Sequence, residues 1–168
     1  LLVEKVKLDS KETGGSLFDK LSGVGAALLV KTLDELEKGT VKPVKQNETE
    51  ATHVKMLDKS FGNIDFSMEA ARIERLIRGL NPWPSAFTHF NGKLLKIWDA
   101  DVCDDVVCES GESVVNGMIT QVDNNSFIVK CGDNSLKINE LQLEGKKRMK
   151  TQDFLRGNHI NTGDILGK

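Results

Sequence analysis

A short basic run near the C-terminus is the group of side chains in this sequence best suited to bind a charged ligand. The run contains no acid and comprises Lys146, Lys147, Arg148 and Lys150. Cations grouped in this way can contact the phosphates of a nucleic acid, although solvated surface lysines are the commoner outcome. Weaker candidates for the same surface are Lys93, Lys96 and Arg156. The net charge is only −2, so any attraction of nucleic acid must come from a local basic face.

No set of side chains has the types and spacing of a catalytic site. The three histidines, His53, His89 and His159, have no nucleophile or carboxylate that the sequence places beside them. A phosphate-binding loop and a dinucleotide fingerprint are both missing from the sequence. The sequence therefore predicts no catalytic residue in this chain.

The cysteines and the acidic residues do not form a recognisable metal site either. Cys103, Cys108 and Cys131 lack the spacing of zinc ligands, so free thiols are expected. Residues 99–112 hold six acids and no base, without the regular spacing of oxygen ligands: Asp99, Asp101, Asp104, Asp105, Glu109 and Glu112. We expect a solvated acidic face there, and no bound metal.

The first half of the chain predicts a terminal strand, a long helix and a linker. Residues 1–8 alternate loosely, as in a strand. Ser16 and Asp19 approximate a capping box, and Gly39 with Pro43 ends the helix. The apolar stripe of this helix follows helical spacing and consists of Leu17, Leu21, Val24 and Leu28. We expect the stripe to be buried against the second half or another chain, because exposed apolar patches of that size are rare.

The second half predicts a helix followed by a small β-rich domain. The helix starts at Ser67 and ends at Asn81-Pro82-Trp83-Pro84, because each proline disfavours helix in the residue before it. We expect Trp83 to pack beneath this corner, so that Trp83→Ala would cost about 3–5 kcal/mol.

From Ala86 onward the periodicity changes from helical to strand-like. Asn91-Gly92 predicts a tight hairpin. Further strands are expected at 117–122, 126–131 and 135–141, with a short helix at 151–156. Several short strands with tight turns favour a small closed barrel of the OB type. No apolar run approaches the roughly 20 residues that span a bilayer.

Six segments of the chain carry more specific patterns. They are residues 13–21, 50–52, 64–66, 78–88, 91–98 and 141–157. The fourth contains Asn81-Pro82-Trp83-Pro84, and the last contains Lys146-Lys147-Arg148-Met149. Together they resemble the C-terminal half of the methionyl-tRNA formyltransferase family, over essentially the whole chain.

The resemblance implies an α+β fragment in three parts. Residues 1–44 would be the terminal strand and helix of a Rossmann-like formyl-transfer domain, residues 45–64 a linker, and residues 65–168 an OB-like tRNA-binding barrel with flanking helices. In that family the upstream domain binds 10-formyltetrahydrofolate and carries an Asn–His–Asp catalytic set. The chain would thus bind no cofactor and be inactive alone.

The resemblance also implies a partner, a site and a compartment. The barrel would hold initiator methionyl-tRNA in the cytoplasm, with Lys146, Lys147 and Arg148 contacting phosphates. Two alternatives stay open: another folate-dependent formyltransferase or hydrolase, and a non-enzymatic OB-like nucleic-acid module. The Lys-Lys-Arg-Met segment favours tRNA over the first, and the unpartnered helix argues against the second.

Overall fold

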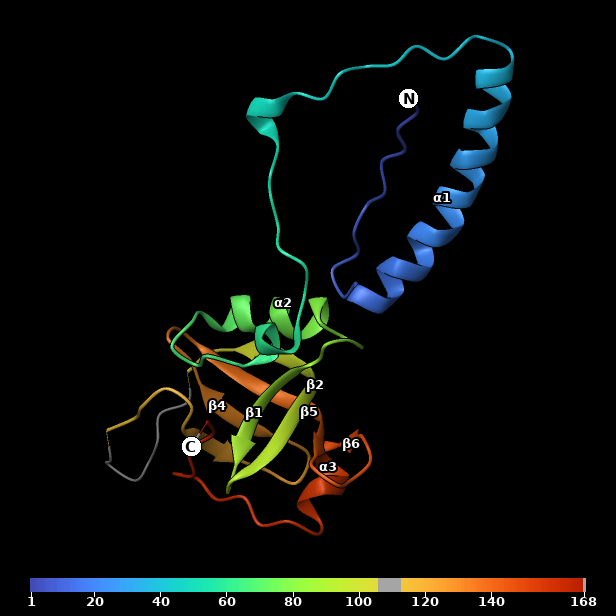
Figure 1. Ribbon diagram of the computed structural model, residues 1–168. Coiled ribbons are helices and arrows are strands. Elements are labelled where there is room, and N and C mark those ends of the chain that lie inside the picture. The colour runs from blue at the N-terminus through green and yellow to red at the C-terminus, as the bar shows by residue number, and fades with distance from the viewer. Residues whose placement is uncertain (106–112, 168) are drawn as a thin grey trace. The chain divides into compact units, whose positions relative to one another are not determined.

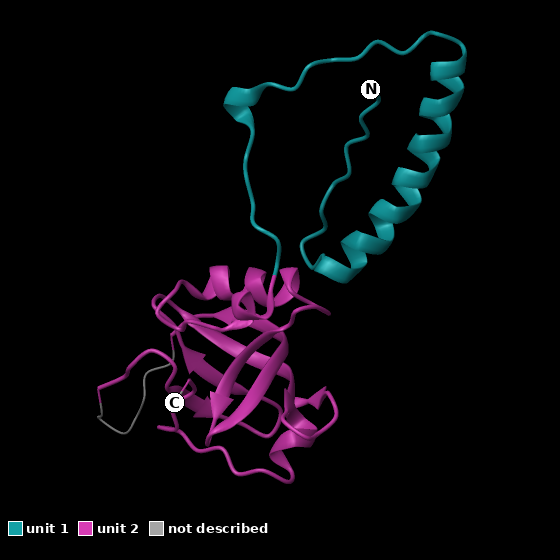
Figure 2. Cartoon of the chain, in the orientation of Figure 1, with its two compact units in different colours: residues 1–57 teal, residues 58–168 magenta. Residues whose placement is uncertain are grey.

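The chain forms two compact units in the computed structural model, which describes residues 1–105 and 113–167 (Figure 1). Unit 1 spans residues 1–57 and unit 2 spans residues 58–168 (Figure 2). Cys108, Glu109 and Glu112 lie outside the described residues. The division of the chain into a transfer-domain remnant, a linker and a barrel stays a prediction.

Unit 1 is built on helix α1 (Gly14–Glu37), followed by a short 3₁₀ turn η1 (Glu48–Glu50). The capping box is formed by Thr13 and Ser16, not by Ser16 and Asp19 as predicted. Each of these two side chains accepts a hydrogen bond from the other residue's backbone N–H, at 3.1 Å and 2.9 Å. Gly39, with φ of 66°, lies just beyond the helix.

Residues 1–9 form no strand, which corrects the first prediction for this unit. A strand needs a neighbour for its backbone hydrogen bonds, and no strand of the described chain pairs with this segment. The segment is held instead by ion pairs, since Lys20 on α1 contacts both Asp9, at 2.9 Å, and Glu12. The Lys20 contact lowers the pKa of Glu12 to about 2.

The apolar stripe of α1 is not buried within unit 1, and its burial against unit 2 or another chain stays a prediction. The helix has no buried residue: Leu21 is 45% exposed, and Leu17, Val24 and Leu28 are only half-buried. Glu4 lines a shallow hollow beside Val24 and Leu28. A single extended segment is too narrow to cover a 24-residue helix, so most of the stripe stays accessible in this chain.

Unit 2 is an antiparallel sheet with helices at its ends, a small α+β domain. Its strands are β1 (Ala86–Phe90), β2 (Lys93–Cys103), β3 (Ile119–Val122), β4 (Phe127–Lys130), β5 (Ser135–Leu143) and β6 (Met149–Lys150). The sheet order is β1-β2-β5-β4-β3, and β6 pairs with β5. Within the described residues the strand pairings do not join β1 to β3, so a closed barrel is not confirmed.

The hairpin between β1 and β2 forms where the sequence predicts it. Asn91 and Gly92 both have positive φ, 51° and 72°, as a two-residue turn of this kind requires. β3 begins at Ile119, two residues later than expected. Gly117 instead lies beside the C-terminal segment. Its N–H donates to the Lys130 carbonyl on β4, and its carbonyl accepts from the Leu166 N–H.

Strand β2 is 11 residues long and extends into the acidic stretch. Asp99 and Asp101 thus lie on a strand, where both accept hydrogen bonds from Asn139 on β5, at 3.0 Å and 2.8 Å. Asp105 pairs with Lys130 at 2.5 Å, and this contact lowers the pKa of the Asp105 carboxyl. These acids have structural partners, so the stretch is more than the solvated face that was expected.

Helix α2 (Ala70–Gly79) covers part of the sheet and contacts β2 (Figure 1). It starts at Ala70 rather than Ser67, because the Ala70 N–H donates to the Asp133 carboxylate at 2.8 Å. This cap comes from a turn distant in sequence. The core beneath the helix is continuous, and its largest fully buried side chains include Phe127, Phe154, Ile73 and Ile77.

The Asn81-Pro82-Trp83-Pro84 corner has the opposite arrangement to the one predicted. Pro84 is buried, whereas Trp83 is 59% exposed. Both Xaa–Pro bonds are cis, and the Asn81 side-chain amide donates to the Trp98 carbonyl at 3.2 Å. Proline and asparagine therefore hold the corner. The loss of 3–5 kcal/mol expected for Trp83→Ala does not apply to a ring this exposed.

No helix among the described residues combines the length and apolar character needed to cross a membrane.

Candidate nucleic-acid interface

The basic run lies on a tight turn between β5 and β6. Gly145 has a φ of 75°, the Lys146 N–H donates to the Leu143 carbonyl at 2.9 Å, and the Gln142 side-chain amide donates to the Lys146 carbonyl at 2.9 Å. A backbone position with positive φ favours glycine, so Gly145 allows the chain to reverse direction here. The turn presents the next residues outward on a backbone fixed by its own hydrogen bonds.

Lys146 and Lys147 occupy the outside of this turn. Both side chains are exposed, as is Lys150 on β6. Within residues 1–105 and 113–167, none of the three forms an ion pair with a carboxylate. Their charges are thus available to an anionic partner, the condition that a phosphate-binding surface must meet in the free protein.

Arg148 does not meet this condition in the free chain, and its predicted phosphate contact stays a prediction. Its guanidinium donates to the Glu140 carboxylate at 2.5 Å. Register explains the contact: β5 and β6 are antiparallel with Glu140 opposite Lys150, so Glu140 lies beside the strand that Arg148 enters. The hydrogen bond that Arg148 donates to Glu140 raises the pKa of Arg148 above its ordinary value.

Trp98 is the functional candidate that the sequence pattern did not identify. The Arg148 guanidinium lies over its ring at 4.7 Å from the centroid, and the Lys96 ammonium lies at 5.6 Å. Each such cation–π contact is worth about 0.5–1 kcal/mol at exposed sites. The Trp98 Nε1–H is buried without a partner among the described residues. The alternation Lys96-Ile97-Trp98 places lysine and tryptophan on one face of β2. This alternation is the sequence pattern from which the role of Trp98 could have been predicted.

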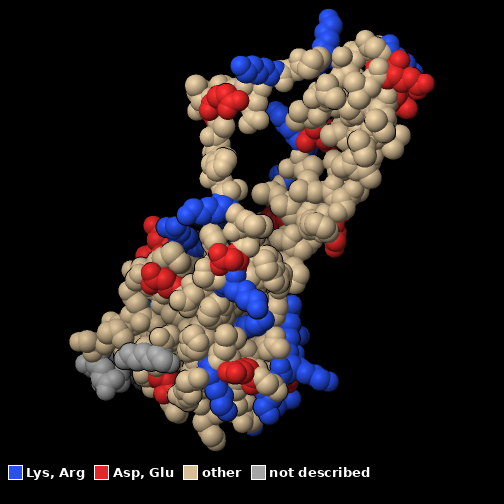
Figure 3. Space-filling model, in the orientation of Figure 1, with Lys and Arg blue, Asp and Glu red and all other residues tan. Residues whose placement is uncertain are grey.

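These side chains form one surface across β2, β5 and β6. Lys96 and Arg148 both contact the Trp98 ring, and Lys96 lies directly opposite Gln142, whose side chain donates to the Lys146 carbonyl. We call this the β2–β6 surface, and its members are Lys96, Trp98, Lys146, Lys147, Arg148 and Lys150. Figure 3 shows basic side chains gathered on the part of unit 2 where β6 and helix α3 (Thr151–Leu155) lie.

Lys93 and Arg156, the other two predicted residues, lie near helix α3 (Thr151–Leu155). Lys93 is exposed at the start of β2. Arg156 contacts Asp153 at 3.1 Å, with side chains 70% and 55% exposed, and pairs of that kind contribute little to stability. Each of the two lines a hollow beside α3 rather than the β2–β6 surface.

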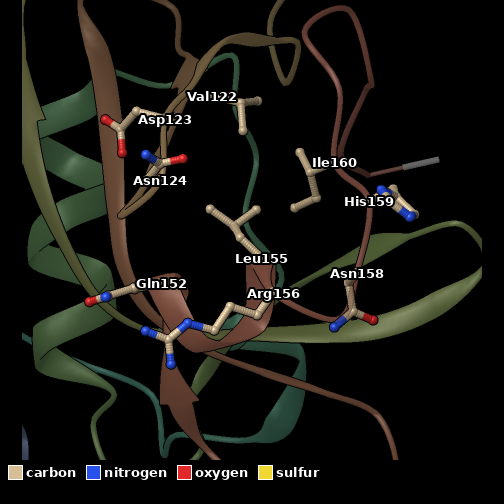
Figure 4. Close-up of a pocket in the computed structure, with 9 residues that line it drawn as sticks. All are labelled: Val122, Asp123, Asn124, Gln152, Leu155, Arg156, Asn158, His159 and Ile160. Carbon is tan, nitrogen blue, oxygen red and sulfur yellow. The ribbon is translucent and has the colours of Figure 1, made fainter.

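The larger hollow has a volume of about 460 Å³ (Figure 4). Val122, Leu155 and Ile160 point toward one another across it. The polar side chains around them are Asp123, Asn124, Gln152, Arg156, Asn158 and His159.

The described residues contain no cluster of three side chains able to hold a metal ion. Cys103 and Cys131 are free thiols, and burial raises the pKa of Cys131 to about 12. A thiol with so high a pKa stays protonated and unreactive at neutral pH. His89 packs edge-on against Phe87, with ring centroids 6.0 Å apart. None of these groups forms a catalytic constellation.

Unit 2 is thus a small α+β domain that carries a basic surface. Comparison with known sequences gives its family, since residues 56–159 match the family described as the formyl transferase C-terminal domain. The chain belongs to this family.

Two relatives extend the similarity to the whole chain. Methionyl-tRNA formyltransferase from Lachnospira eligens is 61% identical over 168 residues, covering 100% of the chain and 53% of the relative. The enzyme of the same name from Agathobacter rectalis is 49% identical, covering 96% of the chain and 50% of the relative. The chain thus spans about half the length of these relatives.

A solved structure supports the fold at lower identity. HypX from Aquifex aeolicus is 15% identical with a TM-score of 0.57, and the match covers 95% of the chain and 31% of HypX. At this identity the similarity concerns the fold alone.

Proposed function

We propose that this chain is the tRNA-holding part of an enzyme that formylates methionyl-tRNA for translation initiation in the cytoplasm. The observation that carries the proposal is the β2–β6 surface, where Lys146 and Lys147 are exposed on a hydrogen-bonded turn and form no ion pair with any described residue. The names of the relatives, both methionyl-tRNA formyltransferases, support the proposed enzyme and substrate. A non-enzymatic module or another folate-dependent enzyme accounts less well for both observations.

The domain plan that goes with this function has three parts. Residues 1–44 are the end of a Rossmann-like formyl-transfer domain, residues 45–64 are a linker and residues 65–168 are an OB-like barrel. The accessible stripe of α1 supports the first part, because an amphipathic helix of this length normally packs against a larger body. The curled sheet with helices at its ends supports the third (Figure 1).

In the whole enzyme the formyl donor is 10-formyltetrahydrofolate. The neutral amine of the methionyl group would attack the formyl carbon, and the bond from that carbon to the folate nitrogen would break. A general base would take the amine proton and an oxyanion stabiliser would hold the developing charge, so that formylated methionyl-tRNA and tetrahydrofolate are released. HypX has been solved in complex with tetrahydrofolic acid, in line with folate chemistry in relatives of this fold. We propose no folate site in this chain, whose described residues carry no suitable catalytic set.

The contribution of this chain is to position the tRNA. Holding the body of the tRNA on unit 2 keeps its aminoacyl end near the transfer site, so that the second encounter becomes intramolecular. Backbone contacts of this kind fix position without reading sequence. Recognition of the initiator would then be achieved elsewhere in the enzyme.

Binding of labelled initiator tRNA to the 168-residue chain tests the proposal. Fluorescence anisotropy between 0.05 and 0.3 M salt should show saturable binding, with log K falling linearly as log salt rises. Absence of binding at 0.05 M salt, by a chain with the circular dichroism of a folded protein, would contradict the function.

Glu140 should weaken this binding, because it occupies Arg148 in the free protein. Glu140→Gln removes the competing charge, and we expect a tRNA affinity about 3–8-fold higher at 0.1 M salt, with the salt dependence steeper by about 0.9 units. Glu144→Gln is the matched control, since Glu144 lies on the β5–β6 turn, four residues from Glu140, and accepts from the Leu94 N–H rather than from a cation. Equal effects of the two substitutions would show that net charge alone, and not release of Arg148, controls the affinity.

A further inference from the structure

A polar groove beside α3 is not explained by the positioning role of the β2–β6 surface. It consists of two hollows of about 460 Å³ and 290 Å³, and both are lined by Asn158 and His159. The larger reaches toward Asn124 on the β3–β4 turn, and the smaller reaches Asn91 on the β1–β2 turn. We call these two hollows together the α3 groove.

The lining of the α3 groove combines an apolar floor with a polar rim. The floor of the larger hollow is formed by Val122, Leu155 and Ile160. Four side-chain amides lie along the rim of the two hollows: Asn91, Asn124, Gln152 and Asn158. Pockets with apolar walls and a few polar groups are typical of sites for small organic ligands. Amides can donate to and accept from the edge of a planar heterocycle, which aliphatic side chains contact through its face.

The charges of the α3 groove favour an anion. Lys93 lines the smaller hollow, and Arg156 lines the larger one, where its only carboxylate contact among the described residues is the solvent-exposed pair with Asp153 at 3.1 Å. The one carboxylate is Asp123, which already accepts from the backbone N–H groups of Asn125, at 2.6 Å, and Ser126, at 2.8 Å. These hydrogen bonds lower the pKa of Asp123 and keep its oxygens engaged within the β3–β4 turn.

A nucleotide has the three features that this groove complements: a planar apolar face, an edge with donors and acceptors, and a phosphate. Proteins that recognise RNA commonly take unpaired bases from loops and ends in this manner. The larger hollow lies within the size range of small-ligand pockets, about 300–1,000 Å³.

We propose that the α3 groove binds one unpaired ribonucleotide, with its base on the Val122–Leu155–Ile160 floor and its phosphate near Arg156 or Lys93. The ligand has two sources of the same chemistry, a free nucleotide or a nucleotide of the bound tRNA, and the second source rests on the proposed function.

The double variant Gln152→Ala, His159→Ala tests the groove. Both residues are exposed, and neither makes a side-chain hydrogen bond among the described residues, so the variant should fold. His53→Ala is a matched control, because His53 is an exposed histidine in unit 1. Each chain is titrated with adenosine, cytidine, guanosine and uridine 5′-monophosphates, and separately with unmodified tRNA, while the amide spectra are recorded by NMR.

We expect tRNA affinity to fall about tenfold in the double variant, with an unchanged salt dependence because no cation is lost. In the parent chain, the amides of Asn158 and His159 should shift with tRNA. If these amides also shift with a mononucleotide, the groove binds free nucleotides as well as a nucleotide of the tRNA. Parent-like tRNA affinity in the double variant, with no shift at these amides on adding either ligand, would overturn the groove proposal and leave tRNA docking intact. Shifts with mononucleotides in a chain that does not bind tRNA would overturn tRNA docking and leave the groove.

Discussion

Replacing Lys146 and Lys147 together by alanine should weaken tRNA binding about 60-fold at 0.1 M salt. Each phosphate contact contributes about 0.9 units to the slope of log K against log salt, so two lost contacts flatten it by about 1.8 units. Arg148 is left in place, because Glu140 and Trp98 already hold its guanidinium. Anisotropy titrations of labelled tRNA at four or more salt concentrations measure both quantities.

The matched control is Lys42→Ala with Lys45→Ala, which removes two exposed lysines from unit 1. The control has the same change in net charge, so long-range attraction falls equally in both variants. We expect its slope to stay within about 0.5 units of the parent, since no phosphate contact is lost. Equal slopes for the two double variants would mean that the lysines of the β5–β6 turn are solvated surface residues that make no phosphate contact.

Phe127→Ala should destabilise unit 2 by about 3–5 kcal/mol, the usual cost of emptying a fully buried phenylalanine site. Phe127 on β4 is 0% exposed and belongs to the continuous core between the sheet and α2. The chain has two tryptophans, Trp83 and Trp98, and both lie in unit 2. Urea unfolding followed by tryptophan fluorescence therefore reports on this unit alone.

Phe18→Ala is the control for this stability measurement. Phe18 lies on α1 in unit 1 and is 72% exposed, so the tryptophan transition should keep its midpoint. A parallel loss of stability in both variants would mean that the two units unfold together. A loss below about 1 kcal/mol for Phe127→Ala would contradict a packed core at β4.

Two features set by neighbouring residues were predicted correctly from the sequence, whereas the capping pair of α1 and a strand at residues 1–8 were not. The Asn91-Gly92 hairpin forms because both residues accept positive φ, and α1 forms because its apolar residues recur at helical spacing. The family was also identified correctly from short patterns, and residues 56–159 match its C-terminal domain. In each case the information lies within a few residues of the feature.

Features set by contacts between distant segments could not be found in this way. The start of α2 depends on Asp133, 63 residues away from Ala70, and the state of Arg148 depends on β5–β6 register. Trp83 was misplaced because a proline-rich corner indicates rigidity but not which of its side chains faces inward. Here Pro84 is the buried residue and Trp83 the exposed one.

The surface that covers the α1 stripe could not be predicted for a different reason. Its spacing correctly predicts an amphipathic helix, but periodicity does not identify the surface that covers the apolar face. Within unit 1 no element buries the stripe, and its side chains are half-buried or exposed.

We claim that tRNA lies on the β2–β6 surface, and an NMR footprint of tRNA on the isotope-labelled chain is a direct test. On adding unlabelled initiator tRNA, we expect the amides of Gly145, Lys146 and Lys147 and the Trp98 indole N–H to shift or broaden first. The amides of Lys42 and Lys45 should be unchanged at the same ratio. A footprint confined to unit 1, or one that spares residues 144–150, would contradict the claim.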